Sequence, residues 1–310
     1  MFDFRQLRYF IAVAEELSFT RAAIRLHLSQ PPLSQQIQSL EKDLGVRLLE
    51  RNRRKVALTA PGELFLVQAR QILASADTAR TQVIAAAAGY RGQLRVAYTV
   101  SVSFHPSFPR ALLRYQQIAP DVRLQLCEKY TQAQYTALLD NEIDVGFVRD
   151  KPGRAQDPGR LRLVEITREP LLIALPAAHP LAGRAKLQMK ELAHDKFVSQ
   201  PRELTSTCHD RLLKLANGAG FEPVIVQQAE QLNGMLALVA AGMGVALVPA
   251  SMQAMLLEGV CYVPLEDADA FMLLAAASRA DDHSPTLQHF LSTVAEIAKG
   301  GWLVGSGQSC

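Results

Sequence analysis

The chain has 310 residues, 49% of them hydrophobic, so it can bury a substantial core and is long enough for more than one domain. No apolar run approaches the roughly 18 residues of a membrane span, and the first residues lack the apolar core of a signal peptide, so we expect a cytoplasmic protein with no membrane partner. The net charge of +3 is uneven: residues 1–60 carry ten Lys/Arg against six Asp/Glu, whereas the remaining 250 carry 23 against 24, which predicts a small module that contacts a polyanion, attached to a larger neutral part.

Two helices are predicted in the first 30 residues. Residues 4–17 form the first, because apolar side chains recur on one of its faces. A short helix follows, with Thr20 as its N-cap and with Thr20 and Arg21 among the predicted DNA contacts. The tight "LHLS" connection leads to a third helix. Helices joined in this way are typical of a helix-turn-helix that binds double-stranded DNA.

The third helix begins with two adjacent prolines, in "LSQPPLSQQIQSLEKDLG" (28–45). With Ser29 as N-cap, Pro31 and Pro32 occupy the second and third helical positions, where the backbone N–H has no intrahelical partner, so they start the helix and do not break it. A buried stripe follows at Leu33, Ile37, Leu40 and Leu44, and Gly45 ends the helix. The opposite face is either merely solvated or reads base edges, and its predicted DNA contacts are Gln30, Pro31, Ser34, Gln35 and Gln38.

A run of positive charge, "RNRRK" (51–55), lies between the apolar segments "VRLL" and "VALT". This pattern predicts a two-stranded wing that reaches phosphates or the minor groove through Arg51, Arg53 and Arg54. A charge run is often only solvated, but its place directly after a helix-turn-helix favours DNA contact. Residues 1–60 are therefore predicted to be a winged helix-turn-helix DNA-binding domain.

A long helix is expected over residues 61–89, with Pro61 near its start and "GYRG" at its end. Apolar residues recur at spacings of three and four, which is typical of a coiled-coil seam. The alternative is packing of the helix on its own domain, but its length favours a homodimer formed through this linker helix. The predicted seam is Phe65, Ala69, Ile72, Ala76, Ala79, Val83 and Ala86.

From residue 93 onward, apolar strands alternate with helical stretches, which predicts a largely parallel α/β sheet. Residues 90–310 are expected to form two similar lobes, lobe I at about 90–166 and 268–300 and lobe II at about 167–267, joined by two crossing segments. Such a fold makes a hinged cleft that suits a small ligand.

Ligands of open α/β sheets bind outside the carboxyl ends of the strands. Hydroxyl groups and an arginine at these ends would suit a carboxylate or similar anion. Each residue alone could be a cap or a surface residue, and Thr131 in particular could be only an N-cap. The candidates are Ser101, Ser103, Thr131, Arg149 and the loop Ser199, Gln200, Pro201, Arg202 and Thr205.

Catalytic and metal-binding motifs are not found. The seven histidines are scattered, without HExxH or GxSxG, so we predict no catalytic residues and no enzyme. The chain has four cysteines, Cys127, Cys208, Cys261 and Cys310, and they lie far apart in the sequence. This spacing favours reduced thiols and predicts no metal site. No cofactor is expected besides the organic-acid ligand. Cys208 reads as an inert small residue.

The segments "SFTRAA", "LSQPPLSQQI", "LEKDLGVRLLER" and "LTAPG" closely resemble the DNA-binding domain of LysR-type transcriptional regulators. The resemblance continues through "DVGFVR", "HPLA" and "LVAAGMGVALVPAS", and so covers about 300 residues. It implies a winged helix-turn-helix, a linker helix and a two-lobed effector domain like a periplasmic binding protein. It further implies an activator that forms homotetramers, binds a small effector between the lobes and contacts RNA polymerase, with Phe147 added to the effector residues.

Within this family the chain is most similar to regulators of aromatic-acid and chlorocatechol breakdown, on "FRQLRYFIAVAEE", "SQPPLSQQI" and "LVPAS". That similarity implies a muconate-like or benzoate-like effector. Alignment at "TVSVSFHPSFP" needs a one-residue insertion, which leaves open whether Ser101 or Ser103 meets it. The peroxide-sensing branch would have a second cysteine where Asn217 stands. The rival class is a solute-binding protein of the same two-lobed fold.

Overall fold

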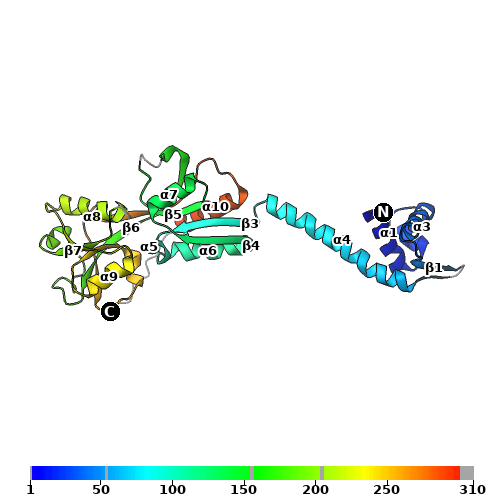
Figure 1. Cartoon of the computed structure of the whole chain (residues 1–310), viewed down its shortest axis with the longest axis horizontal. Coiled ribbons are helices and arrows are strands. Elements are labelled where there is room, and N and C mark those ends of the chain that lie inside the picture. The colour runs from blue at the N-terminus through cyan, green and yellow to red at the C-terminus, as the bar shows by residue number, and fades with distance from the viewer. Residues whose placement is uncertain (1, 53–54, 154–156, 203–205, 301–310) are drawn as a thin grey trace. The chain divides into compact units, whose positions relative to one another are not determined.

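The computed structural model describes residues 2–52, 55–153, 157–202 and 206–300, and the chain divides into two compact units, Met1–Ala85 and Ala86–Cys310. Figure 1 shows the elements of each unit. Across the described ranges, no helix is long and apolar enough to cross a membrane.

Unit 1 contains three short helices, a two-stranded wing and most of a long helix. The bounds are α1 Phe4–Glu16, α2 Phe19–Arg25, α3 Gln30–Leu44, β1 Leu49–Asn52, β2 Lys55–Leu58 and α4 Ala60–Ala87. One apolar core joins the helices, with Phe10, Leu33 and Ile37 fully buried in it. The three-helix and wing architecture predicted for this part is confirmed.

The start of α2 differs from the prediction. Its N-cap is Ser18, whose hydroxyl accepts a hydrogen bond from the Arg21 N–H (3.3 Å), and Thr20 lies inside the helix. The prediction of Thr20 as the cap was wrong because α1 ends abruptly at Leu17, which adopts a left-handed conformation (φ 48°). Only Leu17 and Ser18 therefore separate the two helices.

Helix α3 begins and ends as the sequence indicates. Ser29 is its N-cap, the prolines follow in the first turn, and Gly45 ends it in the left-handed region (φ 71°). Near its C-terminus, one carboxylate oxygen of Glu41 accepts from the backbone N–H groups of Leu48 and Leu49, at 2.9 and 3.0 Å. This contact fixes the start of the wing against α3.

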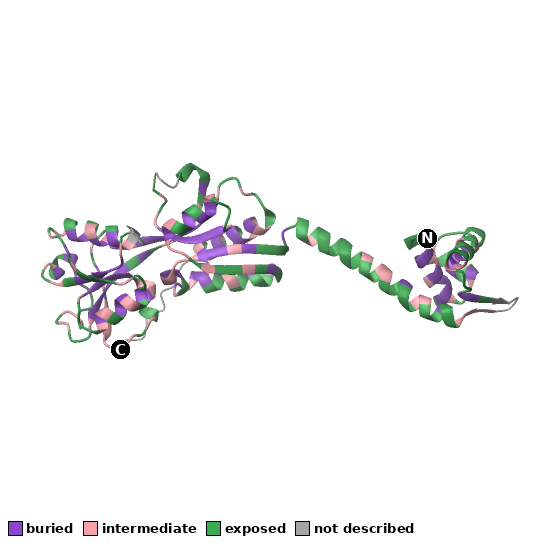
Figure 2. Cartoon of the chain, viewed as in Figure 1, coloured by how far each residue is buried: buried purple, intermediate pink, exposed green. Residues whose placement is uncertain are grey.

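The predicted seam on α4 is wrong over its first half. Ala69 is buried in the unit 1 core, Phe65 and Ile72 pack against that core, and the Phe65 ring lies 5.2 Å from the ring of Phe10. The alternative of packing on its own domain holds for these three residues, because the apolar residues of α1 lie against them. Figure 2 shows that most of the rest of α4 is exposed. Val83, for example, is 69% exposed.

The second unit is built on a seven-stranded mixed sheet in the order β10-β6-β11-β5-β3-β4, with β9 also paired to β6. Its strands are β3 Arg91–Tyr98, β4 Asp121–Glu128, β5 Val145–Arg149, β6 Leu161–Pro176, β9 Ala246–Pro249, β10 Val260–Pro264 and β11 Phe271–Arg279, and a separate pair is β7 Lys196–Ser199 with β8 Val224–Gln228. The helices are α5 Val100–Ser103, α6 Ser107–Ile118, α7 Thr131–Leu139, α8 Ser206–Gly218, α9 Leu232–Ala240 and α10 Pro285–Lys299, with short 3₁₀ turns at Pro158–Arg160, Met189–Leu192 and Ala250–Ala254.

The expectation of a largely parallel sheet was wrong. Strand β3 pairs in parallel with β4 and β5, but β11 pairs antiparallel with both β5 and β6. The difference arises because β6 and β11 are the crossing segments and run through both lobes. Their ladder extends from Phe271↔Pro170 to Arg279↔Leu161 and has one irregularity, where Ile166 has no partner.

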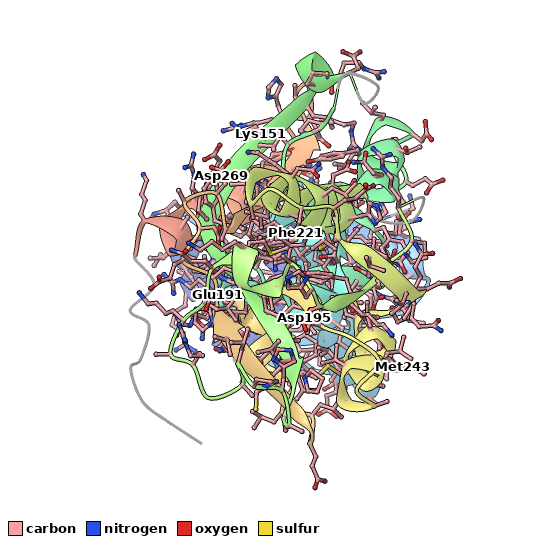
Figure 3. All side chains as sticks on the ribbon, turned by 90° about the vertical axis from the view of Figure 1, so that its left-hand side faces the viewer. Lys151, Glu191, Asp195, Phe221, Met243 and Asp269 are labelled. Atoms are coloured by element: carbon pink, nitrogen blue, oxygen red, sulfur yellow. The ribbon has the colours of Figure 1, made fainter. Side chains whose placement is uncertain are left out.

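Helices cover both faces of the sheet in lobe I. Phe147 and Phe290 are buried with Tyr115 of α6 in a cluster on one face, and Tyr135 of α7 is buried with Val148 on the other. In lobe II, the "HPLA" segment has a structural role. The Leu181 N–H donates to His179 Nδ1 (3.2 Å), so His179 Nε2 carries the proton and donates to Asp195 (3.0 Å). Asp195 is labelled in Figure 3.

Polar contacts that join lobe I to lobe II include three near the end of β5. The Tyr130 hydroxyl donates to the Glu230 carbonyl (2.9 Å), and the Ser251 hydroxyl donates to the Ser101 carbonyl (3.0 Å). The third is an ion pair between Arg211 of α8 and Asp150 (3.2 Å), which follows β5 directly and has a left-handed backbone (φ 59°). These contacts hold the two lobes together around the residue next to Asp150, Arg149.

Candidate functional site

The polar face predicted on α3 is open to solvent. Gln30, Pro31, Gln35 and Gln38 are exposed and Ser34 is half-buried, while the apolar stripe faces inward. The side-chain amides of exposed glutamines on a proline-initiated helix can hydrogen-bond to base edges. The geometry is that of a recognition helix.

The basic residues near this helix are placed unevenly. Thr20 and Arg21 are exposed at the start of α2, and the Arg21 guanidinium bonds to the Glu16 carbonyl and pairs with its carboxylate (3.4 Å). Arg51 lies in β1, where its backbone pairs with Val56. Arg53 and Arg54 lie outside the described residues. The antiparallel wing itself is confirmed.

A small cavity of about 40 Å³ lies between the lobes of the second unit. It is lined by Thr99, Val100, Ser101, Tyr130, Thr131, Arg149, Gln200, Cys208 and Leu232. Four predicted ligand residues are therefore brought together here: Ser101, Thr131, Arg149 and Gln200.

Arg149 is the centre of this cavity's polar contacts. It is 3% exposed and is the last residue of β5. Its backbone N–H donates to the Thr131 hydroxyl (3.0 Å), and its Nε donates to the Ser101 hydroxyl (3.2 Å). Thr131 is thus not the N-cap of α7, a position that Tyr130 takes. Buried Nη2 has no hydrogen-bond partner, which leaves a charged donor for a ligand.

A buried carboxylate balances the arginine. Arg149 Nη1 pairs with Glu169 of β6, and both side chains are 4% exposed. The other carboxylate oxygen accepts from the Ser251 N–H. Burial raises the pKa of Glu169, but the Arg149 charge and the Ser251 hydrogen bonds outweigh it, so the pKa is lowered and the carboxylate stays ionised.

A buried histidine lies close to this pair. Burial lowers the pKa of His105, and the charges of Arg149 and Arg110 lower it further against the opposing effect of Glu169. The ring Nδ1 accepts from the Ser107 N–H (3.3 Å). His105 is therefore neutral around pH 7, and Glu169 supplies the negative charge beside Arg149.

Several predicted ligand residues do not line this cavity. Ser103 is exposed and its hydroxyl bonds to the Val100 carbonyl (2.7 Å), so of the two serines it is Ser101 that faces the cavity. Phe147 lies two residues before the strand end and packs against Phe108 (5.0 Å) in the core. Arg202 is exposed and pairs with Asp210 (2.9 Å). Ser199 is buried beside His209, and Pro201 is half-buried. Thr205 lies outside the described residues.

The sequence reasoning missed some of the residues that build the cavity. Cys208, read as inert, lines it, as do Thr99, Val100, Tyr130 and Leu232. Glu169 had one visible signal, a carboxylate directly before the apolar run "PLLIALP" of a strand that is buried on both faces. Within the described ranges, no three His, Cys, Asp or Glu side chains could hold a metal ion, and Cys127, Cys208 and Cys261 form no disulfide.

Both units match protein families. Residues 4–63 match "Bacterial regulatory helix-turn-helix protein, lysR family", and residues 87–299 match "LysR substrate binding domain". A curated relative is the uncharacterised HTH-type transcriptional regulator YnfL of Escherichia coli, 39% identical over 86% of this chain and 89% of the relative. The helix-turn-helix match favours a regulator over the rival solute-binding protein.

Solved structures agree with this comparison. Full-length CbnR in complex with its target DNA superposes with a TM-score of 0.83 at 34% identity, covering 96% of this chain and all of CbnR. The effector-binding domain of BenM with its effector benzoate gives 0.60 at 30% identity, covering 67% of this chain and 93% of that domain. Full-length BenM of Acinetobacter baylyi is 35% identical over 95% of this chain and 96% of BenM.

Proposed function

Because the chain belongs to the LysR family of DNA-binding transcriptional regulators, we propose that it binds promoter DNA through α3 and the wing and that a small organic acid in the interlobe cavity controls this activity. The acid is aromatic or dicarboxylic, in line with the benzoate that BenM binds. RNA polymerase is the expected protein partner.

The exposed amide face of α3 carries the DNA-binding proposal. Gln35→Ala should reduce the preference for a specific operator over random DNA, because a good bidentate amide contact to a base is worth about 1–3 kcal/mol of discrimination. Arg53→Ala should weaken binding to both DNAs and reduce the salt dependence, because a phosphate contact carries no sequence information.

Fluorescence anisotropy with operator and random duplexes at several salt concentrations measures both effects. Gln71→Ala is the matched control, because Gln71 is an exposed glutamine on α4. Equal loss of specific and non-specific binding in both test variants would contradict the assigned roles.

The unpartnered Nη2 of Arg149 carries the ligand proposal. A carboxylate would supply its missing acceptor, while the Ser101 and Thr131 hydroxyls hold the guanidinium and the backbone of Arg149 in place. Arg149→Met should weaken binding of organic acids by at least about 30-fold, whereas Arg123→Met, at an exposed site in the same lobe, should not. Calorimetry on the full chain tests this, and unchanged affinity in Arg149→Met would refute it.

The second half of α4 is the proposed dimer surface of a homotetramer. Val83 and Ile84 are neighbours in the chain and are 69% and 57% exposed, so they offer apolar surface that a second chain would bury. Val83→Asp should shift the sedimentation of the chain toward smaller species, and Gln82→Asp, at an exposed polar neighbour, should not. Identical sedimentation of the two variants would exclude this surface.

A further inference from the structure

The cavity between the lobes is small compared with the acid proposed for it. It measures about 40 Å³, room for about one to three water molecules, whereas sites for small organic ligands enclose roughly 300–1,000 Å³. Its walls come from both lobes, with Ser101 and Thr131 on one side and Cys208 and Leu232 on the other. An aromatic or dicarboxylic acid therefore needs the two lobes to move apart before it can contact Arg149.

An ion pair between Asp150 and Arg211 joins the two walls of this cavity. Arg211 Nη2 lies 3.2 and 3.3 Å from the two carboxylate oxygens of Asp150. The Arg211 side chain is 16% exposed and that of Asp150 28%, so solvent screens the pair only in part. Asp150 directly follows Arg149, and Arg211 lies about one helical turn after Cys208 on α8. Asp150 and Arg211 themselves lie outside the cavity lining.

Each end of this ion pair is fixed in its own lobe. In lobe I, the carboxylate of Asp150 accepts from the Leu273 N–H (3.3 Å), and its backbone carbonyl accepts from the Tyr135 hydroxyl (2.7 Å). In lobe II, α8 is anchored by Leu212 and Leu215, which are buried in the core of that lobe. Because each end is held by its own lobe, movement of the lobes away from each other breaks the ion pair.

From this geometry we infer that the Asp150–Arg211 ion pair is a latch that holds the lobes closed and opposes ligand binding. The inference rests on the proposed ligand function and adds the regulation of that site. Only chains with parted lobes bind the acid, so the apparent affinity falls in proportion to the fraction of chains in that arrangement. Acid binding in turn shifts the population toward parted lobes, because the acid contacts only that arrangement.

Calorimetry with benzoate on the full-length chain tests the latch. Arg211→Gln should tighten benzoate binding by about two- to fivefold, because it removes a partly exposed ion pair from the closed arrangement alone. Arg211→Lys keeps the charge and should stay closer to the unaltered chain. The control is Arg184→Gln, which removes an ion pair confined to lobe II, with Glu191 (3.4 Å), and should leave the affinity unchanged.

A double-mutant cycle tests the partner of Arg211. Asp150→Asn removes the charge but keeps a side-chain oxygen for the Leu273 N–H, so it should tighten benzoate binding by a similar factor. The double variant Asp150→Asn/Arg211→Gln should gain no more than either single substitution, because both remove the same contact.

A second interlobe contact provides an independent variant. The Ser251 hydroxyl donates to the Ser101 carbonyl (3.0 Å), and Ser251 lies outside the cavity lining. Ser251→Ala should therefore also tighten benzoate binding, and it tests the inference where Arg211→Gln folds poorly. Tighter binding identifies the latch, since damage to the fold would weaken the affinity.

The outcomes separate the latch from the ligand site. Acid binding that Arg149→Met removes, but that Arg211→Gln, Asp150→Asn and Ser251→Ala leave unchanged or weaken, would overturn the latch alone. If neither benzoate nor adipate binds to the unaltered chain or to the latch variants, the proposed ligand function and this inference fail together.

Discussion

The buried ion pair between Arg149 and Glu169 allows a quantitative test of how the cavity is held. Both side chains are 4% exposed, so the pair belongs with buried ion pairs and not with surface pairs worth about 0–1 kcal/mol. Removing one partner leaves the other charge buried and uncompensated, which costs about 3–5 kcal/mol. We expect Glu169→Leu to approach the upper value, because it also strands the Ser251 N–H.

The double variant Arg149→Met/Glu169→Leu should lose much less than the sum of the single variants, because no unpaired charge remains in it. Hydrogen exchange of the β11 amides in the full chain measures this, since buried central strands exchange through global unfolding of their own unit. Each single substitution should reduce protection by about two to three and a half orders of magnitude.

The same double variant should still fail to bind organic acids, which separates stability from ligand binding. If each single substitution lowers the free energy of unfolding by less than about 1 kcal/mol, the pair behaves as a surface pair and does not hold the cavity. A double variant that loses the full sum would equally contradict this role, because the two residues would then act independently.

Two further predictions follow from the packing and from pH. A Cβ on Gly62 would fall on the Leu48 carbonyl oxygen, so Gly62→Ala should destabilise unit 1 by about 1–3 kcal/mol or more in thermal unfolding. Gly183 has open space around it, so Gly183→Ala should cause no such loss. Equal melting temperatures of the two variants would contradict the close approach at Gly62. Burial and nearby positive charge lower the pKa of His105, so the unfolded chain takes up a proton at a higher pH than the folded chain does. The second unit should therefore lose stability as the pH falls below about 6.5. Protonation of Glu169, whose pKa is also lowered, should reduce the stability further only below about pH 4.3. Urea unfolding at pH 7.5 and 5.5 checks this, and a His105→Gln variant with the same pH dependence as the unaltered chain would show that another group is responsible.

Most elements could be predicted because local patterns and tertiary contacts agree. The prolines of α3 lie where a helix needs no N–H donors, and the alternation of strands and helices expected from residue 93 onward is present. Strand β10 (Val260–Pro264) and the short helix α5 are harder to predict, because "VCYVP" is too short to show a period and α5 is a single turn. Pairing directions were also missed, since local periodicity does not report which strand lies alongside which.

The ligand cavity was only partly predictable for a related reason. Ser101, Thr131 and Arg149 lie at or just after strand ends, so the rule on strand ends selects them. Cys208 lies within a helix, where the sequence gives no reason to expect a cavity, and Glu169 lies within a strand, where only the apolar run after it is a signal. The first half of the seam on α4 differs for another reason: its period is real, but periodicity cannot distinguish a partner chain from the protein's own core.

The shared ladder of β6 and β11 restricts which insertions and deletions the second unit can tolerate. Glu169 and the buried residues Leu171 and Ile173 alternate on β6, so loss of a residue just before Glu169 would turn these side chains to the opposite face and remove the carboxylate from Arg149. The exposed residues 183–186, which follow the "HPLA" segment, have no such register to preserve. Homologues of different length should therefore differ in loops such as this one, and engineers who lengthen or circularly permute the protein should leave Leu161–Pro176 intact.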